Sequence, residues 1–384
     1  MKIPFAKPSV GEDEIRSVTE TIRSGWITQG PRVEEFEREF ARYVGARYAV
    51  ATSSCTTALH LVLNTAGVGV GVEVICPTHS FIATANAVRY CGAKPVFVDI
   101  DQESLNIDTE LVKEAITPRT KVILAVHQAG RPANLQALSE LAEAHGITLI
   151  EDAACAAGST YRDMKIGGNN YSSGVCFSFH PRKILSTGDG GMITTDREDL
   201  AIAWRLLRQH GMSTNDYQRH KSQQVVSENY IVLGYNYRMT DIQASIGLPQ
   251  LRRLDELIKE RRYLAHVYNE ALRDVNGIHV FKEPEDVLWN YQTYLIRLEN
   301  EADDLRNRLM QKLFDEGIPT RRGIMSIHRE PCYQEEYGLQ SFAKSERSSD
   351  QCICLPLYPG MHADEVRWVV ERIKDAICKL ERTC

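Results

Sequence analysis

Short runs of apolar residues alternate with longer amphipathic segments between residues 30 and 210. This alternation is typical of a mostly parallel sheet covered by helices, so we predict an α/β fold. One clear helical segment is Leu135–His145, where apolar residues recur about one helical turn apart and Gly146 follows as a stop signal. The expected strands are Tyr48–Thr52, Val74–Pro77, Pro95–Asp99, Val122–Val126, Thr148–Glu151, Val175–Ser178 and Gly191–Thr195.

The pattern changes towards the C-terminus, where one long helical segment is predicted from Asp241 to Arg273. The expected elements beyond it are a strand at Tyr294–Leu298 and helices near 302–315 and 363–380, which suits a small α+β domain. A chain of 384 residues is too long for one ordinary compact core. We therefore predict a large α/β domain over 1–250 and a smaller α+β domain over 251–384.

Composition narrows the possible partners and location. Apolar residues make up 43% and charged residues 25% of the chain, as in ordinary globular proteins. The net charge is −6 with scattered Lys and Arg, so we expect no nucleic-acid partner. The start lacks a secretion signal and no apolar run is long enough to cross a bilayer, which predicts a cytoplasmic protein without membrane contact. Ten irregularly spaced cysteines indicate free thiols rather than disulfides or a metal site.

The first candidate chemistry is a lysine and an aspartate that follow predicted strands. Lys183 lies between an apolar run and the glycine turn Gly188–Gly191, where its amine can form a Schiff base. Asp152 ends another strand and can keep the ring nitrogen of pyridoxal 5′-phosphate protonated. Taken singly, a loop lysine is usually a solvated charge and such an aspartate a helix cap. The combination favours a pyridoxal phosphate site.

Other polar residues are predicted at the same edge of the sheet, outside the carboxyl ends of its strands. The segment Thr52–Thr57 offers hydroxyls and backbone N–H groups where a strand turns into a helix, which suits a cofactor phosphate. Thr78–Phe81 and Ser178 also fall at strand ends. Helix capping is the alternative interpretation of the serine and threonine residues, because both are preferred caps.

Together these segments resemble the DegT/DnrJ/EryC1/StrS family, which comprises sugar aminotransferases of the fold-type I pyridoxal phosphate enzymes. The resemblance covers nearly the whole chain, and it implies an aspartate aminotransferase-like large domain with a mostly parallel sheet and a smaller C-terminal domain. It rests on matching segments at Ser24–Pro31, Ser54–Leu61, His79–Asn86, Glu151–Ala154, Phe177–Met192, Gly234–Asp241 and Leu355–Met361.

The resemblance also implies roles for single residues. Lys183 would hold the cofactor as an internal aldimine and move a proton to and from the substrate carbon, while Asp152 would pair with the pyridinium nitrogen. Asn236 would reach the cofactor phosphate of a neighbouring subunit, making the enzyme a homodimer with a shared active site. The remaining cofactor contacts would be stacking by Phe81 and phosphate binding by Thr56 and Ser178, and the substrate-side candidates are Trp26, Thr28 and His328.

Three positions depart from the pattern that the family would lead us to expect. Cys55 stands in the phosphate turn where many relatives have glycine, and Cys155 stands where many have a glutamine or histidine that contacts the cofactor. We keep both as cofactor-binding positions, although the hydrogen bond expected at Cys155 is weakened. Asn134 replaces an acidic residue that is common after the segment His127–Gly130.

The expected reaction is transfer of an amino group from L-glutamate to a keto group of a nucleotide-linked deoxysugar, through the pyridoxamine phosphate form. A keto-cyclitol aminotransferase using L-glutamine shares the same motifs. A third possibility, suggested by Cys55 and Cys155, is a regulatory homologue that binds cofactor without turnover. Lys183 argues against sugar 3-dehydratases of this fold, in which a histidine replaces the lysine. The sugar, its nucleotide and the aminated carbon are left open by the sequence.

Overall fold

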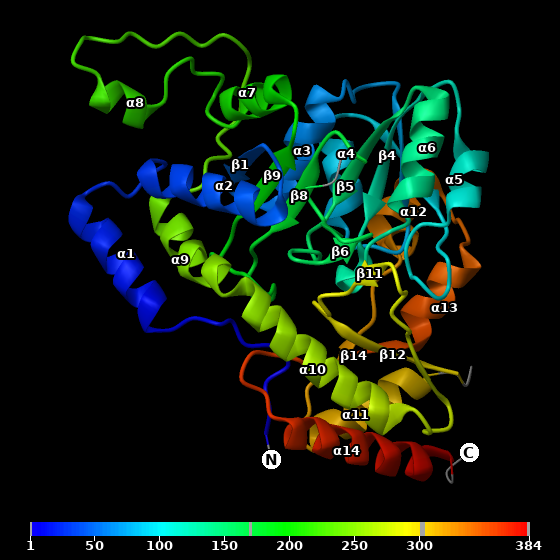
Figure 1. Cartoon of the computed structure of the whole chain (residues 1–384). Coiled ribbons are helices and arrows are strands. Elements are labelled where there is room, and N and C mark those ends of the chain that lie inside the picture. Colours follow the sequence, from blue (N-terminus) through cyan, green and yellow to red (C-terminus); the bar gives the residue numbers. More distant parts are fainter. Residues whose placement is uncertain (1, 169–170, 300–303, 382–384) are drawn as a thin grey trace.

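A seven-stranded sheet forms the centre of the larger part of the molecule (Figure 1). The computed structural model describes residues 2–168, 171–299 and 304–381. The strand order is β1–β9–β8–β5–β4–β2–β3. The strands are β1 (Tyr48–Thr52), β2 (Glu73–Pro77), β3 (Lys94–Val98), β4 (Thr120–Val126), β5 (Thr148–Asp152), β8 (Val175–Ser178) and β9 (Gly191–Thr195).

All seven predicted strands of this sheet are confirmed, with differences of one or two residues at their ends. Only β9 runs antiparallel to its neighbours, so the other six strands end at the same edge. Burial is almost continuous along these strands because helices cover both faces. Asp152 and Ser178 therefore end adjacent parallel strands, β5 and β8, side by side.

The helices pack against this sheet in separate apolar clusters. One cluster joins α2 to the sheet and contains Phe36, Phe40, Phe177 and Phe179. Another joins α3 and α7 to the sheet and contains Leu59 and Trp204. The helices are α1 (Glu12–Ser24), α2 (Pro31–Val44), α3 (Cys55–Thr65), α4 (Ala83–Tyr90), α5 (Thr109–Ala115), α6 (Leu135–His145), α7 (Glu198–Leu207) and α8 (Asp216–Lys221). The short elements are β6 (Thr160–Tyr161), β7 (Met164–Lys165), β11 (Val287–Leu288) and the 3-10 turn Gln128–Gly130.

The prediction of one long helix from Asp241 to Arg273 is wrong in one respect, because this segment forms two consecutive helices. α9 (Asp241–Arg252) and α10 (Leu254–Leu272) are separated by Arg253, which has φ −110° and ψ 14°. The guanidinium of Arg253 donates to Glu14 and to the backbone carbonyl of Ser9. The amphipathic periodicity continues across Arg253, so the sequence pattern gives no sign of a break. The break coincides with contacts to the N-terminal segment, which is distant in the sequence.

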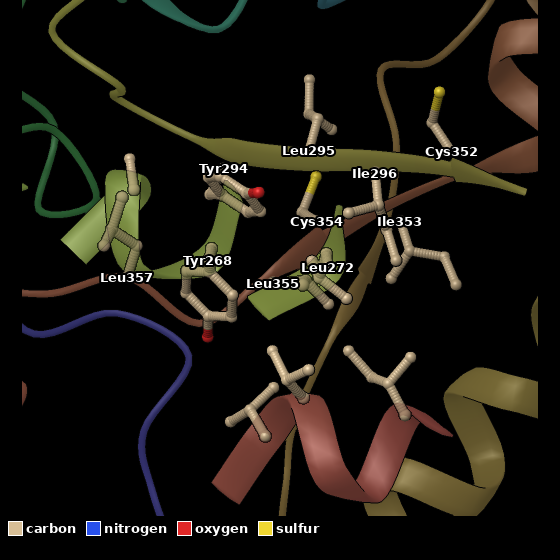
Figure 2. Packing of buried hydrophobic residues seen from close by; sticks show 14 of the residues in the cluster. Tyr268, Leu272, Tyr294, Leu295, Ile296, Cys352, Ile353, Cys354, Leu355 and Leu357 are labelled. Carbon is tan, nitrogen blue, oxygen red and sulfur yellow. The ribbon is translucent and has the colours of Figure 1, made fainter. Parts of the chain in front are cut away.

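A second, four-stranded sheet with the order β10–β12–β14–β13 forms the C-terminal part. Its buried side chains pack against α10 and α14, and Figure 2 shows Tyr294 of β12 close to Tyr268 and Leu272 of α10. The elements are β10 (Ile278–Val280), β12 (Tyr294–Leu298), α11 (Leu305–Asp315), β13 (Arg321–Arg322), α12 (Pro331–Tyr337), α13 (Ala343–Gln351), β14 (Cys352–Leu355), α14 (Ala363–Glu381) and the 3-10 turn Ile327–Arg329. Residues 302–303 of the predicted helix 302–315 lie outside the described residues.

The beginning of the chain packs in this C-terminal part. Ile3 is 5% exposed and belongs to the same apolar cluster as Leu313 and Ile318, and its backbone N–H donates to the carbonyl of Gly317. Figure 1 shows the N-terminus beside α14. We propose that a domain boundary lies near residue 250, with the first residues added to the smaller unit. No helix among the described residues is long and apolar enough to span a membrane.

Candidate active site

A cavity of about 770 Å³ opens at the sheet edge where the parallel strands end, and it is lined from both parts of the molecule. Seven of the predicted site residues line it, although they come from separate segments of the chain. The seven are Cys55, Thr56, Phe81, Asp152, Cys155, Ser178 and Lys183. The predicted convergence of strand ends therefore occurs in the folded chain.

The most buried acid of this cavity is Asp152, which is 5% exposed. One carboxylate oxygen accepts from Thr84 Oγ1 at 2.8 Å and the other accepts from the backbone N–H of Ala154 at 3.1 Å. Burial raises the pKa of Asp152 above its ordinary value, while the Thr84 hydroxyl, the Ala154 N–H and the charge of Lys183 act in the opposite direction. The carboxylate is thus held in one orientation at the end of β5.

Lys183 lies in the loop that follows β8, and its amine faces the same cavity. The Nζ atom donates to Cys155 Sγ at 3.0 Å. Burial opposes the charged form, but the hydrogen bond to Cys155 and the charge of Asp152 raise the pKa of Lys183 above its ordinary value. Gln292 fixes the loop on both sides of the lysine, because its side chain accepts from the N–H of Ile184 and donates to the carbonyl of Arg182.

The hydroxyl-rich segment forms the start of α3. Ser54 caps the helix by accepting from the N–H of Thr57, so the capping interpretation holds for this residue, and both Ser54 and Thr56 line the cavity. A Cβ atom at Gly191 would lie 2.5 Å from the backbone of Ser54. The glycine turn after Lys183 therefore lets β9 approach the helix start closely. Free N–H groups at such a start favour an anion.

Cys55 takes the place of a glycine in this turn without leaving an unpaired polar group. Its Sγ donates to the carbonyl of Cys176 at 3.6 Å. Burial raises the pKa of the Cys55 thiol well above its ordinary value, so it stays neutral. Phe81, in contrast, is 64% exposed although it is aromatic. A flat ring bound over it would cover this apolar surface.

Four other predicted site residues do not line the cavity. Asn236 and Thr28 are exposed, and the Trp26 ring packs edge-on against Tyr217. His328 is only 2% exposed. Its Nδ1 is bonded to Thr78 Oγ1 at 2.6 Å and its Nε2 to Glu346 at 3.1 Å. Both ring nitrogens are thus bonded within the protein and His328 does not line the cavity, so its substrate-side role stays a prediction.

The fold also brings in side chains that the sequence did not indicate. Thr84 is one helical turn beyond Phe81 in the segment already singled out, and this spacing could have suggested it. Gln292 and Arg321 come from the C-terminal part and carry no motif that links them to Lys183. Phe5 reaches the same cavity from the N-terminal segment.

The chemistry of these residues fits pyridoxal phosphate. A lysine amine, a buried carboxylate, an exposed aromatic ring and a helix start with hydroxyl groups are the four parts that this cofactor needs, and they line one cavity. Residues 8–374 match the model of the DegT/DnrJ/EryC1/StrS aminotransferase family. The chain belongs to this family.

Similar proteins extend this assignment over the whole length. The spore coat polysaccharide biosynthesis protein SpsC of Bacillus subtilis is 39% identical over 379 residues, covering 98% of this chain and 97% of SpsC. The aminotransferase TlmJ from Streptoalloteichus hindustanus is 33% identical with a TM-score of 0.91, covering 99% of this chain and all of TlmJ. The putative sugar aminotransferase Spr1654 from Streptococcus pneumoniae, in its PMP form, is 30% identical with a TM-score of 0.93.

The matched region covers 98% of this chain and 99% of Spr1654. It has also been solved in the PLP form, with a TM-score of 0.92. These likenesses confirm the fold-type I architecture and the cofactor predicted from the sequence. The chain is a pyridoxal-phosphate-dependent enzyme of the sugar aminotransferase family.

Proposed function

We propose that the enzyme moves an amino group from L-glutamate to a keto group of a nucleotide-linked deoxysugar. The observation that carries this proposal is the joint presence of Lys183, Asp152 and the helix start of α3 on one cavity. The named role of SpsC in polysaccharide biosynthesis and the name of Spr1654 as a putative sugar aminotransferase support a sugar acceptor.

Lys183 is proposed as the residue that binds the cofactor covalently and then carries the proton at the substrate carbon. When bound, pyridoxal phosphate supplies the electron sink for the bond that is broken. Asp152 would keep a proton on the ring nitrogen, a role that suits its burial and its fixed carboxylate. Cys155 contacts Lys183 Nζ and so orients the amine within the cavity. Phe81 would hold the ring, while Cys55, Thr56 and Ser178, which line the same cavity, would border the phosphate.

The proposed homodimer would complete this site. Asn236, Trp26 and Thr28 lie away from the cavity of their own chain, and Asn236 is exposed, as a residue that serves a second subunit would be before assembly. The neighbouring loop exposes Val225 by 99% and Leu233 by 91%. Large apolar side chains at such exposure are better covered by a partner.

The alternatives left by the sequence concern the acceptor and turnover itself. A keto-cyclitol acceptor with L-glutamine as donor would use the same Lys183 and Asp152. The joint presence of Lys183 and Asp152 on one cavity speaks against a non-catalytic cofactor-binding role. For the location we propose the cytoplasm: all nine described cysteines are free thiols, as is usual in a reducing compartment.

The test is the absorbance spectrum of the holoenzyme before and after addition of L-glutamate and, separately, L-glutamine. Conversion to the pyridoxamine form by L-glutamate supports the proposal, and a preference for L-glutamine supports the cyclitol alternative. A holoenzyme that neither donor converts would contradict both. Lys183→Ala is the matched control: it should keep the fold, measured by circular dichroism, and lose all turnover.

A further inference from the structure

Three arginine side chains line the active-site cavity, and two of them, Arg182 and Arg321, come from different parts of the molecule. Arg182 immediately precedes Lys183 in the loop after β8, and Arg321 begins β13 in the C-terminal part. Both are exposed, whereas Lys183 is half-buried and Asp152 is buried. Exposure thus increases from Asp152 towards the arginines, which places two positive charges at the mouth of the cavity.

Strand pairing directs Arg321 towards the cavity. It lies directly opposite Cys354 in the antiparallel pair β13–β14, so the two side chains share one face. Cys354 also lines the cavity. The guanidinium of Arg321 lies 5.1 Å from the centroid of the Phe5 ring, which lines the cavity as well. This cation–π contact helps to hold the arginine at the mouth.

In the described part of the chain, neither Arg182 nor Arg321 forms an ion pair, whereas the adjacent Arg322 lies 3.7 Å from Glu330. His180 lies among these charges: its pKa is lowered by burial, then by Arg182, Lys183 and Arg321, and only Asp189 opposes. The two arginine charges, with Asp189 as the carboxylate that opposes them at His180, make the mouth of the cavity suited to an anion.

We infer that Arg182 and Arg321 bind the diphosphate group of the acceptor substrate. This inference rests on the proposed function and defines how the acceptor is recognised. Guanidinium groups bind phosphate oxygens in pairs, and a diphosphate offers oxygens to two arginines at once. The donor's α-carboxylate must lie beside the reacting carbon at Lys183, whereas the diphosphate of a sugar nucleotide lies beyond the sugar ring. The mouth of the cavity suits the second position.

The arrangement makes acceptor binding depend on both parts of the molecule. Arg182 belongs to the loop that carries Lys183, and Arg321 belongs to the C-terminal sheet. A bound diphosphate would bridge the two sides of the cavity and fix the sugar between them. Because both arginines are exposed, the affinity for this group should fall as ionic strength rises.

The experiment measures binding of inorganic pyrophosphate to the pyridoxal-phosphate-loaded enzyme by isothermal titration calorimetry. Arg182→Gln and Arg321→Gln should each weaken pyrophosphate binding about tenfold, the usual cost of losing a hydrogen bond to a charged group. Arg367→Gln, a surface change on α14 where Arg367 pairs with Asp364, should leave it unchanged. The L-glutamate half-reaction, followed by absorbance, should keep its rate and KM in the Arg367→Gln variant.

Two outcomes would overturn the inference. Unchanged pyrophosphate affinity in both arginine variants would show that the diphosphate does not bind there. A raised KM for L-glutamate with unchanged pyrophosphate affinity would assign the arginines to the donor's carboxylates instead. Failure of the proposed function is seen separately, because then the wild-type enzyme itself reacts with neither donor while its pyrophosphate affinity can still be measured.

Discussion

At Asp152, burial and hydrogen bonding act on the carboxylate in opposite directions. Burial raises its pKa, and the Thr84 hydroxyl is the largest contribution that lowers it. The role proposed for Asp152 requires an ionised carboxylate, and this ionisation depends on Thr84, which lies outside the sequence segment that carries Lys183. Ser80 in turn shares a hydrogen bond with Thr84 Oγ1 at 2.8 Å, which fixes the hydroxyl.

Replacing Thr84 by valine tests this dependence at nearly constant volume. Thr84→Val should raise the pKa of Asp152 further, so the fall in kcat on the acid side should begin at a higher pH than in the wild type. The pH profile of kcat measures this. Thr84→Ser, which keeps the hydroxyl, should restore the wild-type profile, and superimposable profiles for wild type and Thr84→Val would contradict the assigned role.

A second carboxylate with a shifted pKa is Glu346, which does not line the active-site cavity. Its side chain accepts from the N–H of Phe342 and bonds His328 Nε2 at 3.1 Å, and Arg329 lies 3.0 Å away. Burial alone would raise the pKa of Glu346, but these contacts lower it from 4.5 to about 2. The folded state therefore favours the ionised carboxylate, and this part of the stability is present above pH 4.5 and is lost as the pH falls towards 2.

Glu346→Gln should accordingly lower the free energy of unfolding near neutral pH, with the difference from wild type shrinking as the pH falls towards 2. Denaturation midpoints measured across that range report it. The matched control is Glu335→Gln, an exposed carboxylate on the neighbouring α12. A constant difference between Glu346→Gln and wild type at every pH would rule out ionisation as the cause.

At the scale of secondary structure, Asn134 explains why a departure from the family pattern is tolerated. Its Oδ1 caps α6 by accepting from the N–H of Ala137 at 3.3 Å, and it also accepts from the Tyr161 hydroxyl at 3.1 Å. Aspartate and asparagine cap helices about equally well. Either residue can therefore begin this helix.

Asn134→Ala should destabilise the fold by about 1 kcal/mol, the typical cost of losing an N-cap. Asn134→Asp should stay close to the wild type. Chemical denaturation measures both, and activity at low temperature should be unchanged because α6 supplies no side chain to the cavity. Equal stability of the alanine and aspartate variants would remove the capping explanation.

The elements were largely predictable from the sequence, and the contacts between them were not. Strands such as Thr148–Asp152 are short apolar runs bounded by turn residues, so local pattern is enough to find them. The break at Arg253 and the bonds of His328 involve residues far away in the sequence, such as Glu14 and Thr78. Hydrophobic periodicity contains no information about such partners.

The same limit applies to the active site of the whole molecule. Residues at strand ends, such as Asp152 and Ser178, could be gathered from strand order alone because parallel strands end at one edge. Gln292, Arg321 and Phe5 reach the cavity only because the C-terminal part and the N-terminal segment pack beside that edge. Their contribution follows from the arrangement of the two parts.

At this scale the shared active site remains a prediction. Asn236→Ala should weaken retention of the cofactor while leaving the Lys183 amine able to bind it, because the lost contact is to the phosphate. Cofactor release, followed by absorbance after gel filtration, measures the effect, and light scattering reports the subunit number. Asn229→Ala, in the same exposed loop, is the control, and equal retention in both variants would contradict a site shared through Asn236.

The packing of Ile3 beside Leu313 and Ile318 sets an order of events during synthesis. The first residues leave the ribosome long before their partners exist, so they must wait until nearly the whole chain has been made. The larger sheet can form meanwhile, since its strands all precede residue 196. Closing the N-terminal segment onto the C-terminal unit is then a late step, and it also brings Phe5 to Arg321 at the mouth of the active site.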